Sequence, residues 1–158
     1  MNIGILVHSC TGNTYSVVLK LKERLSTAGH SVIIERISPL GGKETYEKDI
    51  TKIRLEAQPD ISTYDALILG APVRGPSISP VMAACLVQIA SLFNKKIACL
   101  VTEAFPYPWM GGNRSIAQMK KICESKGATI LGTGIVNWMN SNREKNIADT
   151  VEKLSSLF

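Results

Sequence analysis

Polar side chains are concentrated in residues 8–15, HSCTGNTY, directly after the first apolar run of the chain. The segment offers hydroxyl, thiol, amide and imidazole groups, but no side chain that is formally charged at pH 7. Three kinds of chemistry fit it: an anion-binding loop, a nucleophile at Cys10, or an ordinary helix cap. Each of these assigns a different role to the Cys10 thiol.

Hydrogen-bond donors favour the anion-binding interpretation. Glycine at position 12 permits a close approach of backbone to ligand. The first N–H groups of a helix have no partner within the helix, and the helix dipole favours an anion there. Side-chain donors that could complete a phosphate site are the hydroxyls of Ser9, Thr11 and Thr14 and the amide of Asn13. A cap needs only one such residue.

Several nucleotide and phosphoryl sites are excluded by residue type. The loop lacks the lysine of a nucleotide P-loop and the spacing of a dinucleotide G-x-G-x-x-G. A cysteine phosphatase needs an arginine six residues after its nucleophile. For Cys10 that position is occupied by Ser16. A response-regulator receiver needs an aspartate at the end of its third strand, where this chain has Gly70 and Ala71.

Strand-like and helix-like segments alternate along the chain and must position this loop. Short β-branched runs predict strands at residues 3–7, 31–37, 66–69, 96–102 and 129–136. Helical spacing of apolar residues, with glycine and proline as boundaries, predicts helices at 13–28, 43–57, 81–93, 113–125 and 142–157, the fourth capped by Asn113 or Ser115.

Five β-α units of this kind predict one α/β domain over residues 1–158, with a parallel sheet covered by helices on both faces. Binding sites in such sheets lie at the carboxyl ends of the strands. Three connections, residues 8–14, 71–79 and 102–112, reach that end and are rich in polar residues, glycine or proline. We therefore expect them to form one site.

The segment S9-x-T11-G12-N13-T14 resembles the phosphate loop of flavodoxins, [ST]-x-T-G-N-T, at every fixed position. This resemblance implies a flavodoxin-like, three-layer doubly wound fold with a five-stranded parallel sheet in the order 2-1-3-4-5. It also implies bound flavin mononucleotide (FMN). The phosphate would be held by Ser9, Thr11, Gly12, Asn13 and Thr14, while Cys10 contributes its backbone and is no nucleophile.

The same resemblance implies that the other two connections enclose the isoalloxazine ring. In the connection at 71–79 the ring-binding residues would be Pro72, Val73, Arg74 and Gly75. In the connection at 102–112 they would be Thr102, Glu103, Ala104, Phe105, Trp109, Gly111 and Gly112. Trp109 is the preferred ring-stacking residue among the aromatic residues of the second connection. Arg74 can stabilise the negative charge of reduced flavin. His8 either bonds within the core or lies near the flavin, with no catalytic role assigned.

Three functions follow from these residues. The first is an FMN-binding electron-transfer protein that serves a redox partner protein. The alternative is an NAD(P)H-dependent FMN oxidoreductase acting on quinones or similar small acceptors, which P72-V73-R74-G75 and the later glycine pair partly resemble. A non-redox flavodoxin-like binding domain is disfavoured by the intact phosphate motif. The residues leave open whether the chain is a carrier or an enzyme.

The composition of the chain limits the kinds of partner that we expect it to bind. The net charge of +5 fits either a solvated surface with a surplus of lysine or an anionic cofactor and an acidic or uncharged partner. No aromatic interleaving or known motif supports nucleic-acid binding. No apolar stretch reaches the about 20 residues of a spanning helix, and no signal peptide is predicted, so we expect a cytoplasmic protein without a membrane partner.

The four cysteines form no C-x-x-C pair, and Cys85 and Cys99 are expected to be buried.

Overall fold

A computed structural model describes residues 1–158. The strands are β1 (Asn2–Val7), β2 (Ser31–Arg36), β3 (Ala66–Arg74), β4 (Ser77–Ile78), β5 (Lys96–Glu103) and β6 (Thr129–Asn137). The α-helices are α1 (Asn13–Thr27), α2 (Pro80–Gln88), α3 (Gly112–Ser125) and α4 (Arg143–Ser155), with 3-10 turns at Ile50–Lys52 and Pro108–Met110. None of the helices combines the length and apolar character needed to cross a membrane.

The sheet has the predicted topology. Its parallel strands run in the order β2-β1-β3-β5-β6, and the two-residue β4 pairs antiparallel with the end of β3. Without this short hairpin strand the order is 2-1-3-4-5, as expected from the sequence. All carboxyl ends of the parallel strands therefore lie along one edge, where β1 and β3 are direct neighbours.

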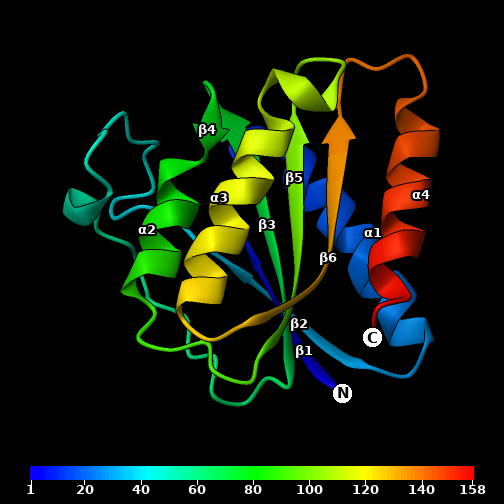
Figure 1. The fold of residues 1–158 in the computed structure, drawn as a ribbon, viewed down its shortest axis with the longest axis horizontal. Helices are drawn as coiled ribbons and strands as arrows, with labels where there is room; N and C mark the ends of the chain where they lie inside the picture. The colour runs from blue at the N-terminus through cyan, green and yellow to red at the C-terminus, as the bar shows by residue number, and fades with distance from the viewer.

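Helices cover both faces of the sheet, α2 and α3 on one and α1 and α4 on the other (Figure 1). Alternating side chains of the strands fill two separate apolar cores. On β1, Leu6 packs in the core beneath α2 and α3, while Ile5 and Val7 pack in the core beneath α1 and α4. This burial on both faces explains why the strands are continuous apolar runs.

The helix predicted at residues 43–57 is wrong, so the second β-α unit lacks its helix. The residues just before this segment pair with its end instead: Leu40 donates its N–H to the Arg54 carbonyl at 2.8 Å, and Glu56 donates its N–H to the Ser38 carbonyl at 2.9 Å. This closure commits backbone groups that a helix would need. The intervening residues are irregular except for one 3-10 turn, and they pass beside α2 (Figure 1).

Boundaries near the third strand and two helices also differ from the prediction. β3 does not end at residue 69 but continues to Arg74, because Gly70, Ala71 and Pro72 stay paired with β5. Helix α2 already ends at Gln88, and α3 begins at Gly112 with no side-chain cap from Asn113 or Ser115. The connection predicted at 71–79 is therefore largely a β-hairpin.

Two strand glycines provide a test of the core packing. A Cβ at Gly4 would lie 2.6 Å from a ring carbon of Tyr64, a buried residue whose hydroxyl donates to Glu35. A Cβ at Gly132 would lie 2.7 Å from Leu157 Cδ1, the tip of a flexible side chain near the chain end. We predict that Gly4→Ala lowers the free energy of unfolding by about 1–3 kcal/mol, because overpacking against a fixed ring cannot relax.

Urea denaturation measures this effect, with Gly132→Ala as the matched control. The control should change the free energy of unfolding by less than about 0.5 kcal/mol, as is usual where nothing rigid is displaced. Equal losses in both variants would contradict the placement of Tyr64 against β1.

Candidate functional site

A cavity of about 370 Å³ lies at the carboxyl ends of β1, β3 and β5. All three predicted connections contribute to its wall, and so does the irregular segment between β2 and β3. The lining residues are Cys10, Thr11, Asn13, Thr14, Glu44, Tyr46, Pro72, Val73, Arg74, Thr102, Glu103 and Ala104. Its volume lies within the about 300–1,000 Å³ of small-molecule sites.

Backbone N–H groups at the start of α1 form the most distinctive part of the wall. None of the N–H groups from Ser9 to Thr14 has an acceptor within the protein. Gly12 adopts the left-handed conformation, with φ of 92°, and as the N-cap residue it provides no side-chain acceptor. Glycine meets this backbone requirement at little cost. The helix therefore presents unpaired donors, and the positive end of its dipole, near the cavity.

Two loop hydroxyls already have partners. Ser9 Oγ accepts the N–H of Tyr15 at 3.3 Å, which fixes the loop against the first turn of α1. Thr14 Oγ1 lies 2.7 Å from Thr102 Oγ1, and both residues are buried. This second contact joins the helix start to the end of β5. The Thr14 side chain thus has a structural role. The side chains of Thr11 and Asn13, in contrast, line the cavity and make no hydrogen bond within the protein.

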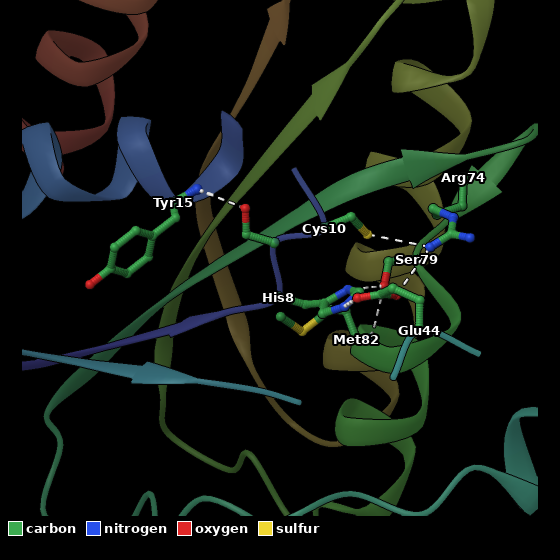
Figure 2. Close-up of polar contacts among 8 residues, drawn as sticks. His8, Cys10, Tyr15, Glu44, Arg74, Ser79 and Met82 are labelled. Carbon is green, nitrogen blue, oxygen red and sulfur yellow. Dashed lines mark hydrogen bonds and ion pairs between the residues drawn. The ribbon is translucent and has the colours of Figure 1, made fainter. Parts of the chain in front are cut away.

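Arg74 is the cationic side chain of the cavity. Its Nη1 donates to Glu44 Oε2 at 3.1 Å and to Cys10 Sγ at 3.3 Å, as Figure 2 shows. The guanidinium also lies over the ring of Tyr46, 5.7 Å from its centroid. Burial raises the pKa of the Cys10 thiol, and the hydrogen bond from Arg74 opposes that rise. Arg74 therefore connects residues 9–14, here called the anion loop, to the segment that contains Glu44.

His8 continues this network into the protein interior (Figure 2). Its Nε2 lies 3.1 Å from Glu44 Oε1 and its Nδ1 lies 2.5 Å from Ser79 Oγ. Because a carboxylate only accepts, we assign the proton to Nε2, so the Ser79 hydroxyl donates to Nδ1. Ser79 Oγ also accepts the N–H of Met82 as the N-cap of α2. Burial lowers the pKa of His8, and the bond to Glu44 opposes this.

The buried side chain of Glu103 explains why two glycines, Gly111 and Gly112, follow each other in the connection at 102–112. Its buried carboxylate accepts the N–H of Gly112 at 3.0 Å and an N–H of Asn137 Nδ2. A Cβ at Gly112 would lie 2.8 Å from Glu103 Oε1, and one at Gly111 would lie 2.9 Å from Val73 Cγ1. Burial raises the pKa of Glu103, and these two hydrogen bonds oppose that rise. The glycines thus permit close packing around a buried carboxylate.

The predicted aromatic residues do not line the cavity. Phe105 and Trp109 are exposed on the connection after β5, and the ring of Trp109 stacks on Tyr107 with centroids 6.0 Å apart and planes 6° apart. Ser9, Gly12, Gly75, Gly111 and Gly112 also lie near the site without forming its wall. Sequence reasoning missed Glu44 and Tyr46, because it placed them in a helix and no motif marks them.

No protein-family model matches the chain, and no curated protein matches it. Solved structures match over almost the whole length. A flavoprotein in complex with FMN from Lactobacillus acidophilus is 15% identical, with a TM-score of 0.67 over 94% of this chain and 97% of that one. Flavodoxin 1 of Bacillus cereus is 17% identical, with a TM-score of 0.64 over 98% of this chain and 97% of that one.

The flavodoxin of Megasphaera elsdenii is 22% identical, with a TM-score of 0.65 over 96% of this chain and 98% of that one. Together with the strand order, these similarities show that the chain has the flavodoxin fold. The predicted fold class is thereby confirmed.

The burial of His8 predicts a pH dependence of stability. A histidine whose pKa folding lowers from 6.5 binds protons more readily in the unfolded chain. Its contribution to the free energy of unfolding is therefore complete above about pH 6.5 and is lost as the pH falls towards the lower, folded pKa. We expect His8→Gln to flatten the fall in stability between about pH 7 and pH 5.

Urea denaturation across this pH range measures the difference between wild type and variant. The control is His30→Gln, in the turn before β2 and outside the cavity, which should retain the His8 part of the dependence. A His8→Gln profile parallel to that of the wild type would contradict the expected effect.

Proposed function

We propose that the chain binds FMN and transfers electrons through it to a redox partner. The observation that carries this proposal is the set of unpaired N–H groups from Ser9 to Thr14 beside a cavity at the carboxyl end of the sheet. Unpaired donors at a helix start bind phosphate, and flavins supply redox chemistry that side chains lack. The fold shared with a flavoprotein that contains FMN gives independent support.

The phosphate is assigned to the start of α1. The backbone from Ser9 to Thr14 provides donors, with the Thr11 hydroxyl and the Asn13 amide beside them. In this proposal Cys10 contributes through its main chain only. The Thr14–Thr102 hydrogen bond holds the helix start against β5 and so fixes the direction of the donors. A neutral loop of this kind needs no lysine, because many short donors share the charge.

The flavin ring is assigned to the wall formed by Pro72, Val73 and Arg74 on one side and 102–104 on the other. Arg74 brings a positive charge to the cavity, so it favours an anionic, reduced ligand. Glu44, paired with Arg74, moderates this charge. Stacking by Trp109 or Phe105 stays a prediction, and it requires their exposed connection to move towards the cavity.

An electron carrier is favoured over an NAD(P)H-dependent quinone reductase. Gly111 and Gly112 belong to the partial resemblance to the enzyme, but their packing around Glu103 and Val73 accounts for both without a substrate. The net charge of +5 favours a partner with acidic groups around its docking surface. With FMN supplied, the carrier should not oxidise NADH or NADPH in the presence of a quinone. Steady turnover would establish the enzyme instead.

Loss of a loop donor should weaken FMN binding. We predict that Thr11→Val or Asn13→Leu raises the FMN dissociation constant by about 10-fold to 100-fold, because a hydrogen bond to a charged group is worth about 1.5–3 kcal/mol. Cys10→Ser should have a smaller effect, since its backbone donor remains. Quenching of flavin fluorescence on titration measures all three. Equal affinities would contradict the assignment of the phosphate.

Removal of the cavity cation should change the redox properties of the loaded protein. Arg74→Gln should lower the midpoint reduction potential, because the reduced ligand loses a charged hydrogen-bond donor worth about 1.5–3 kcal/mol. Arg114→Gln, on the exposed side of α3 and outside the cavity, is the control and should leave the potential unchanged. A redox titration against reference dyes measures both, and an unchanged potential in Arg74→Gln would exclude this role.

A further inference from the structure

Three metal-ligating side chains of different chemistry converge beside the cavity. His8 follows β1, Cys10 belongs to the loop before α1, and Glu44 comes from the irregular segment between β2 and β3. One ligand atom from each, imidazole nitrogen, thiol sulfur and carboxylate oxygen, lies within 4.8 Å of the others. Figure 2 shows the three side chains directed at the same region, together with Arg74.

The histidine of this cluster has the support that a metal ligand needs. Ligating histidines usually bind an oxygen through their second ring nitrogen, which fixes the direction of the first. His8 Nδ1 meets Ser79 Oγ at 2.5 Å, and Ser79 is itself held as the N-cap of α2. Nε2 is thereby directed at Glu44. A shift of the ring proton from Nε2 to Nδ1, which donates to Ser79, frees the Nε2 lone pair.

Two members of the cluster, Cys10 and Glu44, already bind a cationic group. The guanidinium of Arg74 donates to both Glu44 and Cys10, so these groups face a positive charge. Arg74 is 28% exposed in its side chain, which leaves it room to move out into solvent. A divalent ion has a higher charge in a smaller volume and takes sulfur, nitrogen and oxygen ligands directly, whereas the guanidinium only donates hydrogen bonds to them.

We propose that His8, Cys10 and Glu44 form a Zn²⁺ site in the FMN-free protein, with the ion displacing the Arg74 guanidinium. Zn²⁺ accepts this mixed ligand set, whereas Mg²⁺ and Ca²⁺ prefer oxygen alone. Tetrahedral zinc separates its ligand atoms by about 3.5 Å. Glu44 closes the remaining gap, because its side chain is 36% exposed and its backbone is irregular. Three protein ligands leave the fourth position open to the cavity.

This site does not depend on the proposed flavin chemistry. The cation is bound by the side chains of His8, Cys10 and Glu44, whereas FMN is assigned to the backbone and hydroxyl donors of the anion loop. Failure of either proposal therefore leaves the other standing. The Cys10 thiol loses its proton to bind the metal, so binding releases a proton to solvent.

Isothermal titration of the full-length, FMN-free protein with a zinc salt tests the proposal. We expect one ion per chain, with Cys10→Ser and Glu44→Gln each weakening the affinity more than about 10-fold, because even outer-shell changes cost that much. Arg74→Gln should bind Zn²⁺ more tightly, since the competing cation is gone. Glu47→Gln, an exposed carboxylate on the same segment, and Thr11→Val, an anion-loop hydroxyl, should bind like the wild type.

Cobalt substitution identifies the thiolate directly. Co²⁺ bound at the site should show a thiolate charge-transfer band in the wild type and in Glu47→Gln, and the band should be absent in Cys10→Ser. Absence of a 1:1 zinc isotherm would overturn the proposal. So would zinc affinities in Cys10→Ser and Glu44→Gln equal to that of the wild type, or weaker binding in Arg74→Gln.

Discussion

Unpaired backbone donors at the start of α1 are the constraint on which the site depends. A helix that begins at a buried end of a sheet normally satisfies its first N–H groups with a side-chain cap. Here Gly12 stands at the cap position and provides no side chain, and the N–H groups from Ser9 to Thr14 have no protein acceptor. In the proposed function an anionic ligand supplies the missing acceptors, and its binding completes the helix start.

The rest of the fold holds these donors in place. β1 and β3 are neighbours at the centre of the sheet, and α1 packs in the core beneath them through Val17, Val18 and Leu21. The Thr14–Thr102 contact then joins the helix start to β5, while Glu103 fixes the next connection through Gly112 and Asn137. Packing of α1 against the sheet and the Thr14–Thr102 contact thus hold the helix start that presents the backbone donors.

Local patterns predicted the fold and most of the cavity wall. The apolar run before the anion loop and the helical spacing of Val17, Val18 and Leu21 are properties of single elements, and the parallel topology follows from their alternation. The helix expected at 43–57 does not form, because its end pairs with Ser38 and Leu40, which precede it, and this pairing overrides its amphipathic pattern. Glu44 was missed for the same reason: its contacts with His8 and Arg74 are tertiary, and no local spacing encodes them.

The central claim is that the ligand is held by its phosphate, and a comparison of FMN with riboflavin tests it most directly. The two ligands share the isoalloxazine ring and differ in the phosphate, so fluorescence titration of the same protein with each isolates the contribution of the anion loop. Loss of several charge-assisted hydrogen bonds of about 1.5–3 kcal/mol each predicts that riboflavin binds at least 100-fold more weakly. Equal affinities for FMN and riboflavin, or no binding of either, would contradict the account.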